Sequence, residues 1–531
     1  MAEAAAERKA ARRRVALGLL VLGALAAFPA HAGLGPIVEV ETGTLQGVAA
    51  AGAEQFLGIP YAAPPVGELR WRPPALPEPW KGVRPASVLA SECAQLPSSN
   101  GPGSAAEDCL TLNVYRPAEA GSGLPVLVWF HGGGLVNGSG NQTDGSALAA
   151  EQDVVVVMVN YRLTVFGFLA LPGLSAEADD ASSGNLGLAD QQAALGWVQR
   201  NIAAFGGDPG NVTIAGQSAG GGSVCYHLGS PTAAGLFQRA IIHSGAFDLL
   251  ILPGGGGGPC TTRTLADVEA AGSSFAEAAG CAEPATQLEC LRALPAETLL
   301  EASASFAAQP NASGALLPEP VLDVIAERRW NEVPILVGST RDEAQLGVIS
   351  FPATAPPLAP ASYELFAGIV FGGDAPRVLA EYPAGDYPDP AFALSAAVTD
   401  AGFACPTDTL RRFLAKRTRL WGFEFADGAA PPGELGGAPT GAYHTAEVQY
   451  LFAYTPFQGA LSAEQEALAA EMRAYWAAFA RSGDPRVEAA PKWPRFTARA
   501  RRVLSLDPVG SRATKRFAKL HHCKLWKKLQ R

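Results

Sequence analysis

Short, uninterrupted runs of apolar residues recur along the chain, and turn residues bound each of them. These runs cover residues 126–130, 154–159, 212–215, 240–243, 335–338 and 420–425. Continuous apolar runs of this length predict strands that are buried on both faces. Helical stretches alternate with the runs, and this alternation predicts an α/β fold whose central sheet is mostly parallel and covered by helices on both faces.

Two stretches have clear helical periodicity. Residues 186–204 lead into the apolar run at 212–215, and residues 463–481 carry large apolar side chains at helical spacing. In the second stretch these side chains are Leu468, Met472, Tyr475, Trp476 and Phe479. A stripe of this kind normally packs against a core, so we interpret it as a core face and not as a binding surface.

Stretches rich in glycine and proline predict loops. A glycine run at 254–258 predicts a surface loop within the Gly- and Ala-rich region 245–332. Proline-rich stretches at 352–360 and 431–440 predict further loops, which we expect to lie over the mouth of a site. Because the sequence has no internal repeat and no sharp break in composition, we expect residues 33–531 to form a single domain.

Residues 1–32 have the pattern of an export signal. Lys and Arg are concentrated before position 15, residues 15–28 are apolar, and Ala30-His31-Ala32 is a small-x-small cleavage site. We therefore expect cleavage after Ala32 and a secreted or periplasmic protein, and the three arginines at 12–14 leave the twin-arginine route open. A retained anchor is the alternative, but the apolar run is short for a bilayer. We expect no integral membrane segment once the signal is removed.

The composition indicates a globular protein with a large core, because 48% of the 531 residues are hydrophobic and only 17% are charged. The formal net charge is −10, and removal of a signal with five positive and two negative residues makes it −13. An acidic chain argues against nucleic acid as a partner. The sequence predicts no oligomeric state.

The end of the chain differs in charge from the rest. Residues 512–531 contain eight Lys or Arg and no acid. A basic amphipathic helix there is able to touch anionic membranes. The apolar residues Leu520, Leu525 and Trp526 stand beside Cys523, however, and favour a docked end that a disulfide tethers to the protein.

Eight cysteines in an exported chain predict disulfides. Spacing alone does not fix which cysteines pair. Cys225 falls on a predicted helix, where we expect a buried free thiol. Cys260 has no evident partner and stays unassigned.

The run at 212–215 leads into Gly216-Gln217-Ser218-Ala219-Gly220. A G-x-S-x-G sequence between a strand and a helix predicts a sharp turn that carries the serine at its tip. A serine hydroxyl is a poor nucleophile at neutral pH, so it needs a histidine base, a carboxylate that orients the base, and amide donors for the developing oxyanion.

The histidine can be found by elimination among the seven in the chain. His31 leaves with the signal, His131 stands in a glycine run, His227 and His243 lie close to the serine turn, and His521 and His522 belong to the tail. His444 remains as the candidate base.

The acid should lie between the serine and the histidine, since the chain order in this kind of site is serine, acid, histidine. The run at 335–338 precedes Asp342 and Glu343, and pattern alone does not separate these two carboxylates. Ordinary solvated loop carboxylates are the alternative interpretation. The oxyanion donors are predicted after the run at 126–130, where His131-Gly132-Gly133-Gly134 exposes backbone amides, and Ala219 supplies a third amide.

These motifs resemble the type-B carboxylesterase/lipase family, which includes the cholinesterases and bacterial para-nitrobenzyl esterases. Residues 205–220 resemble the family's serine signature, and residues 107–117 resemble its second signature. Residues 56–62 and 64–67 are similar to its N-terminal block, and the similarity runs from about residue 40 to the tail. The resemblance implies an α/β-hydrolase fold with large loop and helical insertions.

The resemblance also implies roles for individual residues. It implies Ser218 as nucleophile, Glu343 rather than Asp342 as acid, His444 as base, the amides of Gly133, Gly134 and Ala219 as oxyanion hole, and Ser244 as a serine that supports the triad. It further implies the disulfides Cys93–Cys109, Cys281–Cys290 and Cys405–Cys523.

The sequence therefore predicts an exported serine carboxylesterase that hydrolyses small-molecule esters through an acyl-enzyme intermediate and needs no metal or organic cofactor. A lipase for longer acyl chains and a non-catalytic cholinesterase-like binding protein are the alternatives. Three departures from the family bear on the substrate. No Trp lies between Cys93 and Cys109, and Gln217 replaces the acid of cholinesterases, so we expect no preference for choline esters. Leu135 stands where many members carry an aromatic residue, and this departure bears on the shape of the acyl pocket.

Overall fold

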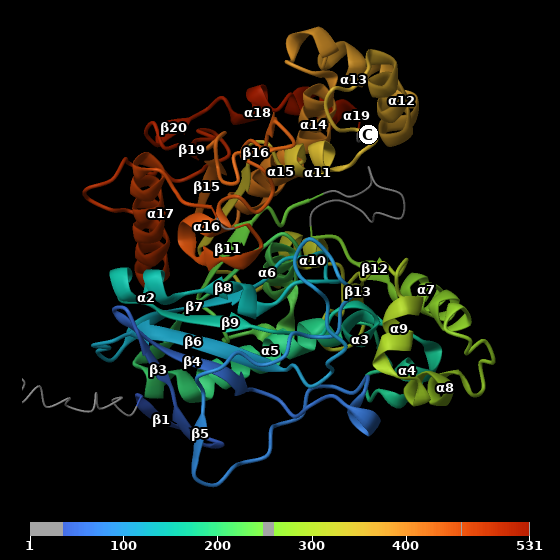
Figure 1. Cartoon of the computed structure of the whole chain (residues 1–531), viewed down its shortest axis with the longest axis vertical. Coiled ribbons are helices and arrows are strands. Elements are labelled where there is room, and N and C mark those ends of the chain that lie inside the picture. The colour runs from blue at the N-terminus through green and yellow to red at the C-terminus, as the bar shows by residue number, and fades with distance from the viewer. Residues whose placement is uncertain (1–34, 248–259, 458, 530–531) are drawn as a thin grey trace, which may run out of the picture. The chain divides into compact units, whose positions relative to one another are not determined.

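The structure, a computed structural model, describes residues 35–247, 260–457 and 459–529. The predicted signal at 1–32 and the glycine run at 254–258 lie outside the described residues. Within Ile37–Arg531, which groups into one unit by its internal contacts, an 11-stranded sheet forms the centre (Figure 1). Its strands, in chain order, are β3 (Val48–Ala50), β4 (Ala53–Pro60), β6 (Thr111–Pro117), β7 (Leu124–Phe130), β9 (Val155–Val159), β10 (Gly207–Gln217), β11 (Arg239–His243), β14 (Ile335–Thr340), β15 (Leu420–Phe425), β19 (Val503–Leu506) and β20 (Arg512–Thr514).

The described helices connect and cover these strands. They are α2 (Ser146–Gln152), α3 (Thr164–Phe168), α4 (Pro172–Glu177), α5 (Leu186–Asn201), α6 (Ala219–Gly229), α7 (Leu265–Ala278), α8 (Gln287–Ala293), α9 (Ala296–Ala302), α10 (Val321–Ala326), α11 (Gln345–Ser350), α12 (Pro360–Phe371), α13 (Ala375–Glu381), α14 (Pro390–Thr399), the π-helix η8 (Asp400–Ala404), α15 (Cys405–Leu414), α16 (Val448–Leu451), α17 (Ala463–Ser482), α18 (Phe517–Leu520) and α19 (Cys523–Leu529).

The centre of the sheet is parallel and its ends are antiparallel. The strand order is β20-β19-β15-β14-β11-β10-β7-β9-β6-β4-β3, and every pair from β19 to β9 is parallel. All six apolar runs form strands of this parallel part, which confirms the predicted α/β fold. The strands β3, β4 and β6 add an antiparallel edge that the apolar pattern did not predict.

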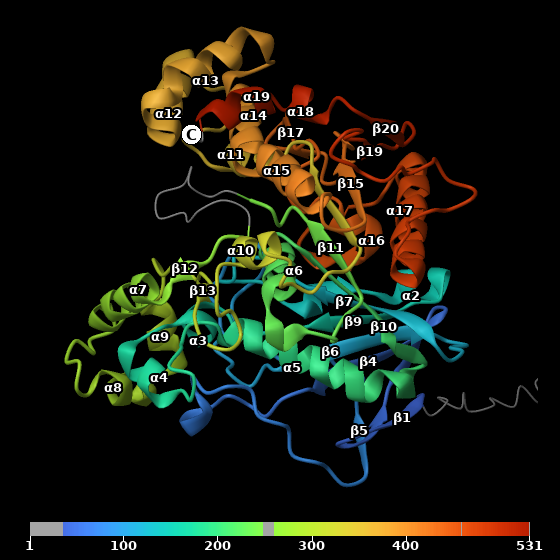
Figure 2. The same ribbon diagram turned by 180° about the vertical axis from the view of Figure 1, so that it is seen from behind.

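Successive side chains of the central strands enter two different cores, because they point to opposite faces of the sheet. On β7, Val126 and Val128 belong to the core under α5 and α6, whereas Leu127 and Trp129 belong to the core under α16 and α17. Figures 1 and 2 show these helix pairs on the two faces. Burial on both faces explains why these strands have no polar alternation.

Helix α17 closes one face of the sheet. Its start is fixed by a capping box, in which Ser462 Oγ accepts a hydrogen bond from Gln465 N and Gln465 Oε1 accepts one from Ser462 N. Gly483 ends it in a left-handed conformation with a φ of 70°. The predicted apolar stripe of α17 is buried in the core, as expected.

The structure contains four disulfides: Cys93–Cys109, Cys225–Cys260, Cys281–Cys290 and Cys405–Cys523. Three of them are the pairs that the family resemblance implies. The expectation of a free thiol at Cys225 is wrong, because helix α6 brings it within 5.8 Å of Cys260, measured between Cα atoms. Four disulfides suggest an extracellular or periplasmic protein.

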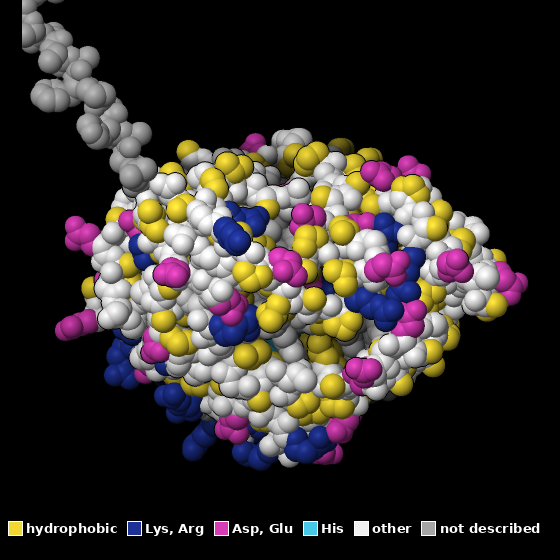
Figure 3. Space-filling model, turned by 90° about the horizontal axis from the view of Figure 1, so that it is seen from below, with side chains coloured by type: hydrophobic (Ala, Val, Ile, Leu, Met, Phe, Trp, Pro, Cys, Tyr) yellow, Lys and Arg dark blue, Asp and Glu magenta, His cyan; other side chains and the backbone are white. Residues whose placement is uncertain are grey.

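The C-terminal helices pack against α13 and η8 of the same chain. Cys523 is bonded to Cys405, Trp526 is buried, and its indole N–H donates to Tyr382 Oη at 2.8 Å. This confirms the predicted docked tail. None of the described helices combines the length and apolarity needed to cross a membrane. On the face drawn in Figure 3, basic and acidic side chains are interspersed.

Candidate active site

Ser218 occupies the turn between β10 and α6. Its φ of 56° and ψ of −124° lie outside the usual regions for a residue with a side chain, which is strain of the kind stored at functional sites. Two backbone hydrogen bonds of 2.9 Å hold the turn, from Ser218 N to His243 O and from Gly222 N to Ser218 O. Gly220 permits the close approach to β7, since a Cβ there would lie 2.0 Å from Phe130 O.

The loop after β14 carries the acid. Glu343 is 2% exposed, and its Oε1 accepts a hydrogen bond from Thr340 N at 2.9 Å. Its Oε2 lies 2.5 Å from His444 Nδ1, and His444 N donates to Glu343 O at 3.1 Å. Asp342 has no such contact with His444, and its Oδ2 accepts from Ala442 N at 2.9 Å. Of the two candidate acids, Glu343 is therefore the one that meets the histidine.

His444 has one nitrogen engaged with an acid and one directed at the serine turn. With Nδ1–H donating to Glu343, Nε2 is an acceptor, and Gln217 Nε2 lies 3.2 Å from it. Burial lowers the pKa of His444, but the charge of Glu343 and its hydrogen bond outweigh this effect and raise the pKa above its ordinary value. The Gln217 contact was missed from the sequence, where Gln217 was noted only as a departure from the family.

The glycine run after β7 presents free amides. Gly133 has a φ of 104°, and a Cβ there would lie 2.0 Å from Asn137 O, so only glycine fits this turn. The N–H groups of Gly133, Gly134 and Ala219 donate no hydrogen bond to any described residue. Unpaired amides beside a serine are the donors that an oxyanion needs.

The other histidines have structural contacts. Burial lowers the pKa of His131 to about 4 and that of His227 to about 3, and His227 Nε2 lies 2.8 Å from Gln191 Oε1. His243 Nε2 accepts from the Trp476 indole at 2.9 Å. Ser244 is buried, but its Oγ has no hydrogen-bond partner among the described residues, so its support of the triad stays a prediction.

Ser218, Glu343 and His444 line one cavity of about 860 Å³. Its apolar lining comes from several elements: Trp129, Leu346, Val348, Val398, Phe403, Leu435, Val448 and Tyr454. The described lining contains no Lys, Arg or Asp. Phe403, 5.1 Å from His444 between ring centroids, comes from the π-helix η8 and had no sequence signal. Of the two predicted loops, 431–440 reaches the cavity through Pro432 and Leu435, whereas 352–360 does not line it.

Leu135 lies beside two of the residues with unpaired amides, Gly134 and Ala219. Together with Gly134, Ala219 and Phe247 it lines a smaller cavity of about 90 Å³. Among the described residues, no cluster of three or more His, Cys, Asp or Glu side chains is arranged to hold a metal ion.

Comparison with known proteins gives the family. Residues 35–359 and 377–526 match the carboxylesterase family. The chain is 35% identical over 500 residues to fumonisin B1 esterase of Sphingopyxis macrogoltabida, covering 89% of this chain and 87% of that protein. It is 34% identical over 503 residues to para-nitrobenzyl esterase of Bacillus subtilis (strain 168), covering 89% and 94%. A solved PNB esterase superposes with a TM-score of 0.75 at 33% identity, covering 93% and 99%. The chain therefore belongs to the carboxylesterase family, has the α/β-hydrolase fold, and is a carboxylic ester hydrolase.

Proposed function

We propose that this chain hydrolyses uncharged carboxylic esters through an acyl-enzyme intermediate, with Ser218, His444 and Glu343 as the catalytic triad. The observation that carries the proposal is the 2.5 Å contact between Glu343 and His444 in a cavity that Ser218 also lines. A carboxylate on Nδ1 fixes the tautomer of the imidazole, so that Nε2 is available as a base.

The reaction then runs in two halves. Ser218 Oγ attacks the ester carbonyl while His444 Nε2 takes its proton, and the amides of Gly133, Gly134 and Ala219 bind the oxyanion. Collapse of the tetrahedral intermediate breaks the ester bond, and His444 returns its proton to the leaving alcohol. Water then attacks the acyl-enzyme with the same base, and the acid product leaves.

The cavities of about 860 Å³ and about 90 Å³ near the serine turn indicate which alcohol and acyl groups a substrate can carry. Apolar and uncharged polar side chains line the large cavity, Glu343 is the one acid in its described lining, and Lys, Arg and Asp are absent from that lining, which suits an uncharged alcohol group with an apolar or aromatic part. The small cavity next to the oxyanion amides has room for a short acyl chain only. The name of the Bacillus relative refers to an aromatic ester, which agrees with this assignment.

A series of para-nitrophenyl esters from two to sixteen carbons tests the proposal. We expect activity to peak on short acyl chains, to disappear in Ser218→Ala, and to be blocked by organophosphate labelling of Ser218. A peak on long chains would favour the lipase alternative, and an unlabelled, inactive wild-type protein would favour the binding-protein alternative.

We also propose that residues 1–32 are removed during export. The four disulfides support an oxidising destination. The intact mass of protein recovered from the periplasm or medium should correspond to a chain that begins at Gly33. Recovery of the full-length mass would contradict cleavage after Ala32.

A further inference from the structure

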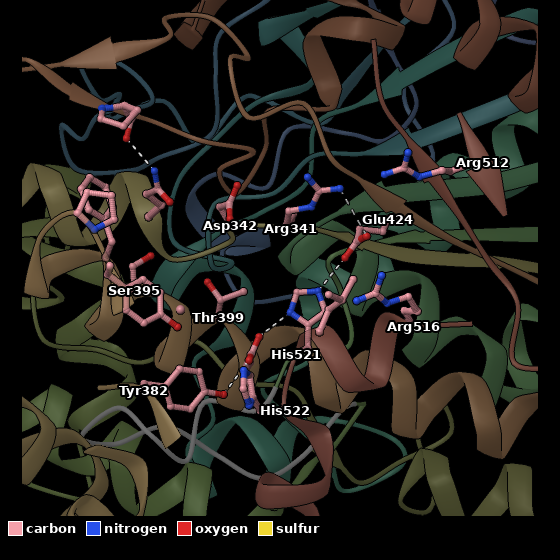
Figure 4. A pocket seen from close by; sticks show the side chains of 18 residues that line it. Arg341, Asp342, Tyr382, Ser395, Thr399, Glu424, Arg512, Arg516, His521 and His522 are labelled. Atoms are coloured by element: carbon pink, nitrogen blue, oxygen red, sulfur yellow. Dashed lines mark hydrogen bonds and ion pairs between the residues drawn. The ribbon is translucent and has the colours of Figure 1, made fainter. Parts of the chain in front are cut away.

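A second cavity, of about 640 Å³, is shown in Figure 4, and Asp342, the chain neighbour of the candidate acid Glu343, lines it. The two cavities share one wall, because Asp342 lines the second cavity and its neighbour Glu343 lines the first. In the same way, Thr399 of α14 lines the second cavity and Val398 lines the first.

The floor of the second cavity is a buried charged network around His521. Its Nδ1 lies 2.5 Å from Asp400 Oδ1 and its Nε2 lies 2.7 Å from Glu424 Oε1. Tyr382 Oη donates to the other oxygen of Asp400 at 2.7 Å. Burial lowers the pKa of His521, but the two carboxylates outweigh it and raise the pKa to about 10. The floor therefore satisfies its own hydrogen bonds and holds a cation between two anions.

Three arginines surround the carboxylate end of this floor. Strand pairing places Glu424, Ser505 and Arg512 in one row across β15, β19 and β20. Arg341 donates to Ser505 Oγ at 3.3 Å and lies 3.9 Å from Glu424. Arg516 lines the cavity from the start of α18. In Figure 4 no dashed line reaches Arg512 or Arg516, and neither guanidinium has a partner among the described residues.

The charges that face the cavity leave a small positive surplus. Arg341, Arg512, Arg516 and His521 are cationic, against the acids Asp342, Asp400 and Glu424. His522 also lines the cavity, but its Nδ1 lies 2.7 Å from Glu381. A ligand with one negative charge fits this balance, whereas a second charge would face the buried carboxylates.

The remaining wall is apolar. Tyr387, Pro388, Phe392 and Leu520 line it from the α14 region and α18. A carboxylate matches the planar fork of an arginine, and an aromatic or apolar body matches this wall. We propose that the second cavity binds a small organic carboxylate with an aromatic or apolar body. This site goes beyond the proposed function, in which the acid that the active site releases carries only a short acyl chain.

Benzoate is the probe, titrated calorimetrically at pH 7 into the Ser218→Ala enzyme. The substitution removes turnover without requiring Ser218 to react with a label, so the titration is possible whether or not the proposed reaction is right. We expect one benzoate per chain, and at least tenfold weaker binding of the uncharged isostere benzamide and of inorganic phosphate.

The decisive variant is Arg512→Gln/Arg516→Gln, with Lys515→Gln/Lys519→Gln as matched control. The control removes the same charge from the same segment, but neither lysine lines the cavity. We expect benzoate affinity to fall about tenfold or more in the arginine variant, as loss of charge-assisted hydrogen bonds predicts, and to stay within threefold in the control. Circular dichroism would verify that both variants fold.

Several outcomes would overturn the proposal. They are no benzoate binding to the Ser218→Ala enzyme, equal binding of benzamide, tighter binding of phosphate, unchanged affinity in the arginine variant, and an equal loss of affinity in the lysine control. The last result would mean that the tail attracts anions only through its general charge.

Discussion

Two histidines, His444 and His521, each lie 2.5 Å from a buried carboxylate through Nδ1, but they differ at the other ring nitrogen. Nε2 of His444 faces the amide of Gln217 beside Ser218, whereas Nε2 of His521 meets a second carboxylate, Glu424. One acid orients the ring and leaves a nitrogen able to take and return a proton. Two acids hold the ring as a cation, which suits a structural role.

The two cavities differ in the same sense. The described lining of the catalytic cavity has no Lys, Arg or Asp, whereas three arginines and three acids line the second cavity. An uncharged ester therefore fits the first and a carboxylate fits the second. Asp342 and Glu343 are adjacent in the chain, yet Asp342 lines the second cavity and Glu343 lines the first.

The largest expected effect concerns the catalytic activity that depends on His444. His444→Asn should lower kcat about 10⁴-fold or more, as Ser218→Ala should, because each removes an essential member of the triad. Ser274→Ala is the matched serine control, since Ser274 lies on the exposed side of α7 and its hydroxyl contacts only Ala270 O among the described residues. Steady-state kinetics with para-nitrophenyl butyrate would measure this, and a His444→Asn enzyme of normal activity would refute the assigned base.

The next effect concerns the contribution of His521 to the free energy of unfolding. His521→Asn should lower the free energy of unfolding by about 3–5 kcal/mol, because it leaves two buried carboxylates without their cation. His522→Asn is the control: its ring is about one-third exposed, and its ion pair with Glu381 is worth about 1 kcal/mol or less. Urea unfolding would compare the two. Equal midpoints would show that the buried network contributes nothing to stability.

The pH dependence of stability gives a smaller, graded effect. The pKa of His521 is raised to about 10 in the folded chain, against about 6.5 when unfolded, so its contribution is complete below pH 6.5 and declines as the pH rises toward 10. The wild-type urea midpoint should fall across this window. The decline should be shallower in His521→Asn, and parallel curves for the two proteins would contradict the raised pKa.

The smallest expected effect concerns Gln217. Gln217→Glu places a carboxylate about 3 Å from His444 Nε2, and a nearby anion favours the protonated ring. Because His444 must be neutral to act as a base, the acidic limb of kcat/KM should move upward by up to about one pH unit. Gln152→Glu, outside both cavities, should leave the limb in place. An unchanged acidic limb in Gln217→Glu would show that the amide does not face the base.

The sequence predicted the strands that are buried on both faces, because such strands are continuously apolar. Strand β4, next to the edge strand β3, was not predicted, since its buried positions recur at every third residue and not at every second one. Elimination among few histidines left His444 as the candidate base. Pattern alone did not separate Asp342 from Glu343, because it does not show which way each side chain points, and only the family resemblance favoured Glu343. The pairing of Cys225 with Cys260 and the approach of Phe403 to His444 depend on tertiary contacts that leave no local pattern.

The partners of His521 precede it by 121 and 97 positions, and this spacing imposes an order of assembly. Chains emerge from the ribosome, or from an export channel, starting at the N-terminus. All three proposed triad residues have emerged by position 444, when Asp400 and Glu424 still lack their histidine. The cavity that Ser218 lines is thus able to form first. The second cavity is complete only after residue 521 has emerged and Cys523 has been oxidised.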